Sequence, residues 1–164
     1  MIKKAVQKVL CEQIRYEMES GYLYLAMAAD FHAKGLDGMA QWMRAQAREE
    51  LGHAMRFFDH VHQRGGRVSL EALAEPKKDW ASPLEAFQAA YEHERMITGR
   101  IDALVETARK ETDNAALLML QWFVGEQVEE EASVKTIVDR LSRIGDSGHG
   151  LVMLDRELGA RGAS

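Results

Sequence analysis

The sequence predicts an all-α protein: a four-helix bundle with one long crossover connection and a short fifth helix near its C-terminal end. The chain has 164 residues, which suits one domain with a full hydrophobic core and is short for two. Hydrophobic residues make up 46% and charged residues 29%, with two prolines. This balance favours long helices, and no segment shows the period-two alternation of a strand. We therefore expect a single domain over residues 1–164, with the bundle at 4–144 and a tail helix at about 148–158.

Glycines and capping residues set the expected bounds of the first two helices. A first helix is predicted over residues 4–34, where Gly35 ends it. Asp37 is predicted to be the N-cap of a second helix, which continues to residue 64 and ends at the pair Gly65-Gly66.

The third helix has a clear start and follows a long connection. Ser82 is the expected N-cap, Pro83 stands at the first helical position, and Glu85 completes a capping box. The connection at residues 65–82 can reach roughly 60 Å if extended, whereas the flanking helices should be roughly 40 Å long. The crossover can therefore run the length of the bundle, and the third helix is predicted to lie parallel to the second.

The last two helices are also bounded by capping residues and glycine. Thr112 or Asp113 is predicted to cap a fourth helix, which runs to Ile144 before Gly145. The tail helix at about 148–158 has an apolar side formed by Leu151, Leu154 and Leu158.

Each of the four long helices has an apolar seam with polar residues at mid-height. Following each helix in alternating steps of three and four identifies the positions that should face the core. The polar positions at mid-height include Glu17 on the first helix, Glu50 and His53 on the second, Glu94 on the third, and Gln127 and Glu130 on the fourth. A buried ionised carboxylate is costly unless it is paired or bound to metal, and the seams contain no lysine or arginine. Two divalent cations would balance the four glutamates.

A bundle without metal is the alternative interpretation. A single glutamate in a seam usually reflects an error of register or a partly exposed position. Four helices that err at the same depth are much less common, so the sequence favours a metal site.

The spacing of the donors indicates the kind of metal. Glu50 and His53 stand at positions i and i+3, so both side chains project from one face of the second helix. The fourth helix offers Gln127 and Glu130 at the same spacing, without a histidine. Oxygen ligands with one imidazole suit iron or manganese better than a soft metal.

Other residues near the seams have two possible readings. Glu49, Glu126 and Glu129 form a second acidic set, which is either a solvated charge run or a third metal site. Tyr24 could donate a hydrogen bond to a ligand or to an oxygen intermediate, and Trp122 lies one turn before Glu126. Both aromatics are more commonly plain core residues.

Composition excludes several other classes of protein. The net charge is −5 and the pI about 5.7, so a clustered basic face for nucleic acid is not expected. Cys11 is the single cysteine, which rules out an intrachain disulfide and a cysteine-based metal knuckle. No secretory signal and no apolar stretch of about 20 residues is present, so we expect a cytoplasmic protein without a membrane partner.

With these residues identified, the sequence resembles the bacterial non-haem ferritins. The similarity covers nearly the whole chain and includes YEMESGYLYLAMA in the first helix, REELGHAMRFFDHV in the second, WFVGEQVEEEASVKTIVDRL in the fourth and GLVMLDRELG in the tail. Each segment falls in its expected helix and order. The resemblance therefore implies a ferritin-like bundle with one long crossover.

The resemblance also implies a ferroxidase centre and two kinds of iron site. It implies a first iron held by Glu17, Glu50 and His53, and a second held by Glu50, Glu94 and Glu130 with Gln127 beside it. It further implies a third iron site formed by Glu49, Glu126, Glu129 and Glu130, and it places Tyr24 with the catalytic residues. Such proteins oxidise Fe(II) to Fe(III) with O2 or H2O2. They store ferric oxyhydroxide inside shells of 24 subunits, with the tail helix near the four-fold axes.

Related families are less similar. Bacterioferritins bind haem through a methionine at the position of Leu51, so no haem is expected here. Rubrerythrins add a four-cysteine iron domain, which a chain with one cysteine cannot form, and the mini-ferritins place their metal site at a dimer interface. A discrete di-iron oxidoreductase or peroxidase of small oligomeric state remains the alternative function. By family geometry, Glu111 and Asp113 could line a three-fold pore.

Overall fold

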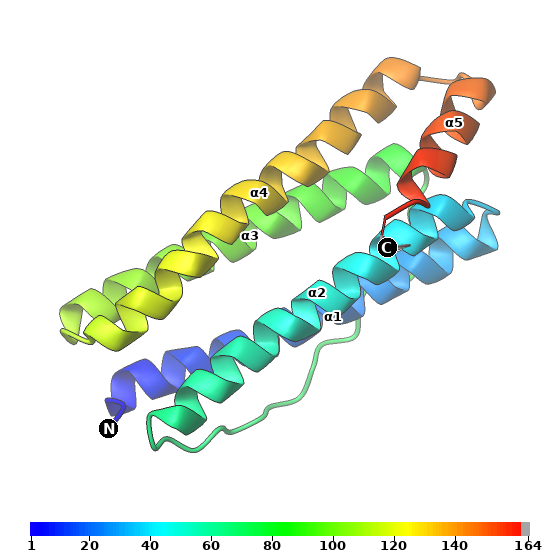
Figure 1. Ribbon diagram of the computed structural model, residues 1–164. Helices are drawn as coiled ribbons and strands as arrows, with labels where there is room; N and C mark the ends of the chain where they lie inside the picture. The colour runs from blue at the N-terminus through cyan, green and yellow to red at the C-terminus, as the bar shows by residue number, and fades with distance from the viewer. Residues whose placement is uncertain (162–164) are drawn as a thin grey trace.

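Five α-helices make up the part of the chain that the computed structural model describes, residues 1–161. They are α1 (Lys4–Ala33), α2 (Asp37–Gln63), α3 (Pro83–Lys110), α4 (Asn114–Ile144) and α5 (Gly148–Leu158). Figure 1 shows α1 to α4 running along a common direction, with α5 turned back from the far end of α4. The predicted fold class is confirmed.

The crossover between α2 and α3 runs along the outside of α1. Near its beginning the backbone carbonyl of Arg67 accepts a hydrogen bond from the side chain of Gln7, at 3.0 Å. Further along, the backbone N–H of Ala74 donates to Glu19, at 3.1 Å, and near its end the Trp80 side chain is buried. The connection thus follows α1 from one end towards the other, as the thin tube between α2 and α3 in Figure 1 shows.

Because the crossover spans the bundle, α3 runs parallel to α2, as predicted. Trp42 near the start of α2 packs edge-on against Phe87 near the start of α3, with ring centroids 5.3 Å apart. At the opposite end, Arg64 forms two hydrogen bonds with Asp113, at 2.9 and 3.1 Å, and so ties the end of α2 to the α3–α4 turn. Asp113 also caps α4 by accepting from Ala116 N–H. The place in a three-fold pore suggested for Asp113 stays a prediction.

The N-caps predicted for α3 and α4 are confirmed, and the one predicted for α2 is not. Ser82 caps α3 by accepting from the backbone N–H of Glu85, although the Glu85 carboxylate accepts from Ala81 N–H instead of closing the box on Ser82. The prediction that Asp37 caps α2 was wrong. Leu36 is the N-cap, and the Asp37 carboxylate contacts His32 at 2.7 Å. As the first residue of the helix, Asp37 instead places its charge where the helix dipole favours an anion.

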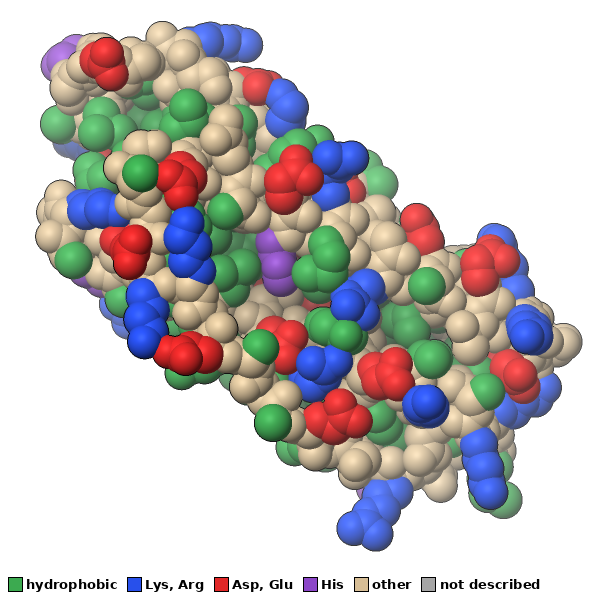
Figure 2. Space-filling view, turned by 180° about the vertical axis from the view of Figure 1, so that it is seen from behind, with side chains coloured by type: hydrophobic (Ala, Val, Ile, Leu, Met, Phe, Trp, Pro, Cys, Tyr) green, Lys and Arg blue, Asp and Glu red, His purple; other side chains and the backbone are tan. Residues whose placement is uncertain are grey.

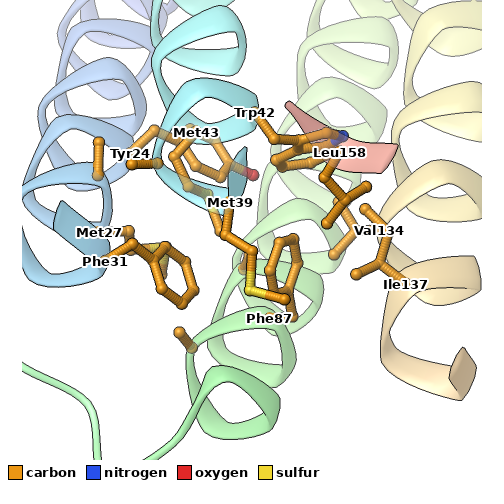
Figure 3. Close-up of a cluster of buried hydrophobic side chains, with 14 of the residues drawn as sticks. Tyr24, Met27, Phe31, Met39, Trp42, Met43, Phe87, Val134, Ile137 and Leu158 are labelled. Carbon is orange, nitrogen blue, oxygen red and sulfur yellow. The ribbon is translucent and has the colours of Figure 1, made fainter. Parts of the chain in front are cut away.

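The bundle core consists of two apolar clusters with a polar layer between them. One cluster surrounds the buried side chains of Tyr24, Phe31, Met39 and Phe87 near the α5 end, and Figure 3 shows how these residues meet across the helices. The other contains Leu10, Phe57, Ile101, Leu120 and Phe123. The buried polar side chains that lie between the two clusters along each helix are Gln13, Glu17, Ser20, Gln46, Glu50, His53, Glu94, Gln127 and Glu130.

α5 is attached to the start of α2. The Asp155 carboxylate accepts a hydrogen bond from Met39 N–H at 2.7 Å, and Leu154 and Leu158 are buried in the first apolar cluster. Leu158 lies beside Trp42 in Figure 3. This packing brings the chain after α5 back over α2, close to mid-height of the bundle.

The surface carries charges of both signs. On the face shown in Figure 2, acidic and basic side chains are interspersed, and neither forms a continuous patch. Within residues 1–161, no helix combines the length and the hydropathy that crossing a lipid bilayer requires.

Candidate metal centre

Four helices contribute the residues of the polar layer. Glu17, Glu50, Glu94 and Glu130 are exposed to solvent by 1%, 2%, 1% and 5%, and His53 by 5%. Each is on the apolar seam of its helix, so the periodicity that buries the hydrophobic residues also buries these. The structure thus brings together the five residues that the sequence selected for the dinuclear site.

Glu17, Glu50 and His53 form the tightest group of donors. One ligand atom from each residue lies within 4.8 Å of the other two, close enough for a single metal ion to contact all three. Glu50 and His53 share a helical face, and His53 Nδ1 is 3.1 Å from a Glu50 carboxylate oxygen. This is the set that the resemblance implied for the first iron. Its ligation of metal stays a prediction.

Glu94 and Glu130 reach the same layer from α3 and α4. The Tyr24 hydroxyl donates a hydrogen bond to one carboxylate oxygen of Glu94, and the Gln127 amide donates to the other at 3.2 Å. Gln127 therefore lies beside Glu94, and in this arrangement it acts as a hydrogen-bond donor.

Two further glutamines orient the carboxylates. Gln13 donates to Glu17 at 2.9 Å, and Gln46 donates to both Glu50 and Glu130, at 3.0 and 2.7 Å. Gln13 and Gln46 each stand four residues before the glutamate on the same helix. Because an amide N–H stabilises a carboxylate without supplying charge, the glutamines hold the donors in place and leave their negative charge available to a cation.

Burial and mutual repulsion shift the carboxylates towards their protonated forms. Burial, followed by the charge of Glu50, raises the pKa of Glu94 to about 8 and that of Glu130 to about 7. The same two causes raise the pKa of Glu17 well above its ordinary value. Several carboxylates in one dry layer cannot all ionise without a compensating cation.

The pKa values of His53 and Glu50 shift in opposite directions, as expected for an ion pair. Burial alone would lower the pKa of His53, but the hydrogen bond and charge of Glu50 outweigh it, with help from the charges of Glu17 and Glu130. The result is a pKa of about 9. Burial likewise acts to raise the pKa of Glu50, yet its bond to His53 lowers it. An imidazolium is thus the cation nearest to the carboxylates, and a metal ion would replace its proton.

The donor set fits a pair of hard divalent cations. In the described part of the chain, no lysine or arginine forms an ion pair with Glu17, Glu50, Glu94 or Glu130. Among residues 1–161, one oxygen of Glu17 is buried with no hydrogen-bond partner. A buried carboxylate oxygen without a partner is costly unless it is a ligand. Carboxylate oxygens with one imidazole are typical of iron and manganese sites.

The residues predicted for a third metal site are placed less uniformly. Glu126 lies 3.8 Å from His53 Nε2, and a three-donor group forms from Glu126, His53 and Glu130. The Glu49 carboxylate is 2.7 Å from Arg161, and the Glu129 side chain is on an exposed position of α4. Arg161 had no role in the sequence-based prediction.

Trp122 is not a core residue. It is 37% exposed, packs edge-on against His53 with centroids 5.5 Å apart, and lies beneath the Arg56 guanidinium, 3.7 Å from its ring. Tyr24, in contrast, is fully buried. The tyrosine therefore belongs to the polar layer, and the tryptophan closes its side towards solvent.

The fold and the site together define a class: helical bundles with a carboxylate-rich metal centre between their helices. Comparison with known proteins gives the family. The Ferritin-like domain of the Ferritin family matches residues 7–144, and the chain belongs to this family.

Similar proteins include ferritins from bacteria and archaea. A "Bacterial non-heme ferritin" of Bacteroides fragilis (strain 638R) is 42% identical over 161 residues, covering 98% of this chain and 100% of that protein. One of Staphylococcus aureus (strain USA300) is 35% identical, covering 98% and 97%. An open pore ferritin from Archaeoglobus fulgidus has a TM-score of 0.97 and 50% identity, covering 98% of this chain and 99% of that one.

Proposed function

We propose that this protein oxidises Fe(II) to Fe(III) at the centre formed by Glu17, Glu50, His53, Glu94 and Glu130, and stores the ferric product. The observation that carries the proposal is the layer of four buried carboxylates that have no lysine or arginine partner among the described residues, within a chain of the ferritin family. Relatives 35–42% identical over nearly the whole chain are named bacterial non-heme ferritins, which supports iron storage.

The residues divide the binding of two iron ions between them. Glu17 and His53 serve the first ion, Glu94 and Glu130 serve the second, and Glu50 lies within reach of both. Anionic oxygen ligands stabilise Fe(III) over Fe(II), so this donor set favours oxidation of the bound ions. Binding displaces the protons that Glu94 and Glu130 hold near neutral pH.

The oxidation of Fe(II) by O2 or H2O2 needs no reductant other than the two Fe(II) ions themselves. Two Fe(II) ions supply two electrons, which with two protons reduce one O2 to H2O2, or one H2O2 to two molecules of water. The Tyr24 hydroxyl donates a hydrogen bond to Glu94 and so helps to orient that ligand. Gln127 supports the other oxygen of Glu94.

Storage needs an enclosed space that one bundle does not supply. We infer assembly into a cytoplasmic shell of 24 subunits, the form that the family resemblance implies, in which Fe(III) hydrolyses to an oxyhydroxide mineral. A third iron near Glu126 and Glu130 would lie between the dinuclear centre and solvent.

Aerobic addition of Fe(II) tests the proposal. Absorbance in the near ultraviolet should rise rapidly, and the protein should keep in solution many more irons than subunits. Glu50→Gln removes the carboxylate shared by the two ions and should abolish the rapid phase, while Glu92→Gln, on an exposed position of α3, should leave it unchanged.

The alternative, a discrete di-iron oxidoreductase or peroxidase, gives different results. Oxidation would then stop at two irons per chain, and native mass measurement would find a small oligomer. An apolar pocket is present between α1, α2 and the crossover, but its lining (Met18, Gly21, Tyr22, Leu25, Ala47, Leu51 and Leu73) includes none of the candidate ligands.

A further inference from the structure

Arg161, which follows α5, lies against the residues that surround the metal centre. Its guanidinium Nη2 donates to the side-chain oxygen of Gln46 at 2.9 Å and to Glu49 at 2.7 Å. The guanidinium also covers the ring of Trp42, 4.3 Å from the centroid. The residue is thus held by three side chains of α2, although it is more than 100 residues away in sequence.

The contact with Gln46 has a consequence for the centre itself. A side-chain amide has one accepting oxygen and one donating nitrogen. Because Arg161 donates to the oxygen, the nitrogen of Gln46 must face the opposite way, where it donates to Glu50 at 3.0 Å and to Glu130 at 2.7 Å. The reversed amide would place its oxygen against two carboxylates and leave Arg161 facing an N–H group.

The contact with Glu49 affects the neighbouring acidic set. Glu49 is close enough to Glu130 for its charge to act on that carboxylate. Its own carboxylate is paired with Arg161, so a cation that uses Glu49 as a ligand must displace the guanidinium or bind beside a positive charge. Both alternatives weaken metal binding there.

We propose that Arg161 is a positioning residue that fixes the Gln46 amide towards the dinuclear centre and, by pairing with Glu49, weakens metal binding at the adjacent third site. The inference rests on the proposed function, because it assigns a role in the same site. If Arg161 has this role, the docking of the tail on α2 influences how metal ions distribute between the dinuclear centre and the third site.

A plain structural role for Arg161 would be to hold the tail on the bundle. A second ion pair already does this: Arg140 forms two hydrogen bonds with Glu157, at 2.7 and 2.6 Å, and neither residue touches Gln46 or Glu49. Glu157→Gln is therefore a matched control, since it weakens tail docking and leaves the contacts of Arg161 in place.

The test is anaerobic titration of the full-length, assembled protein with Co(II), followed by calorimetry and by the visible ligand-field spectrum. Arg161→Ala should tighten the weakest, outer Co(II) step by on the order of fivefold, the scale of a partly exposed ion pair. It should also alter the spectrum of the inner Co(II) ions, because Gln46 is no longer oriented. Arg161→Lys should restore the wild-type outer affinity, and Glu49→Gln in the Arg161→Ala background should remove the gain.

Several outcomes would overturn the inference. Unchanged Co(II) affinities and spectra in Arg161→Ala, with a loss of thermal stability like that of Glu157→Gln, would show that Arg161 only clamps the tail. The absence of an outer Co(II) step from both proteins would refute the role of Glu49. Arg161→Gln removes the charge but keeps a polar side chain with an N–H donor, and it replaces Arg161→Ala in the test if the alanine variant does not fold. Failure of the wild type to bind any Co(II) would instead refute the proposed function.

Discussion

Glu94 gives the protein a stability that depends on pH in an unusual direction. The unfolded chain should lose the Glu94 proton near pH 4.5, whereas burial and the charge of Glu50 raise the pKa in the folded protein to about 8. Between these values the folded state binds more protons, so the free energy of unfolding falls as pH rises. His53 acts in the same direction: its raised pKa of about 9 means that its contribution, complete below pH 6.5, is lost as pH rises towards 9.

The size of the effect follows from the shift. One pKa unit corresponds to about 1.4 kcal/mol, so Glu94 alone should cost about 3 kcal/mol of stability between pH 5 and pH 8 in chelator-treated protein. Glu94→Gln mimics the protonated acid and keeps an acceptor for the Tyr24 hydroxyl. It should remove most of this loss and make the variant more stable than wild type at pH 8.

Guanidinium unfolding followed by circular dichroism, with EDTA present and pH varied from 5 to 8, measures the difference. The wild-type free energy of unfolding should fall more steeply than that of Glu94→Gln. The control Glu92→Gln, on an exposed position of the same helix, should follow the wild type. If wild type and Glu94→Gln give parallel curves, Glu94 is not held protonated by burial and the electrostatic description of the centre is wrong.

Three other perturbations have defined outcomes. Co(II) affinity at the inner sites should fall as pH is lowered below about 8, first because Glu94 and then because Glu130 must release a proton to bind; a pH-independent affinity in calorimetry would contradict this. Gly38→Ala should detach α5, since a Cβ there would lie 1.7 Å from the Asp155 carbonyl oxygen, and limited proteolysis should then remove the tail faster than in wild type. Phe57→Ala, at a fully buried position, should cost about 3–5 kcal/mol in denaturant unfolding, and a loss below 1 kcal/mol would show that the core collapses around the gap.

The sequence was sufficient to predict the helices and to place the candidate ligands on their buried faces, because one pattern controls both. A helix that buries every third or fourth residue buries Glu17 as surely as Leu10, and both are 1% exposed. The E-x-x-H spacing placed Glu50 and His53 on one face without knowledge of the tertiary structure. Long, strongly periodic helices are where such reasoning works best.

The glutamines that donate hydrogen bonds to the buried glutamates were not predicted from the sequence, although their spacing indicates part of this arrangement. Gln13 and Gln46 each precede a seam glutamate by four residues, a spacing that allows a hydrogen bond along one helix. The second bond of Gln46, to Glu130 on α4, depends on how the helices pack and cannot be read from spacing.

Two features could not be derived from local sequence. The carboxylate of Asp37 pairs with His32 across the α1–α2 turn, and α2 begins at Asp37 itself, with Leu36 as the N-cap. Arg161 reaches Glu49 because α5 folds back along α2, and its partner is 112 residues earlier in the chain. Both depend on packing between segments whose relative placement only the folded chain determines.

The central claim is that the buried carboxylate layer binds two metal ions in each chain. Anomalous diffraction from crystals soaked anaerobically with Fe(II) tests it most directly. Two peaks per chain are expected in the core, one among Glu17, Glu50 and His53, and one among Glu50, Glu94 and Glu130, and both should disappear in Glu50→Gln. Anomalous density confined to surface carboxylates, or a core without peaks at full Fe(II) exposure, would contradict the account.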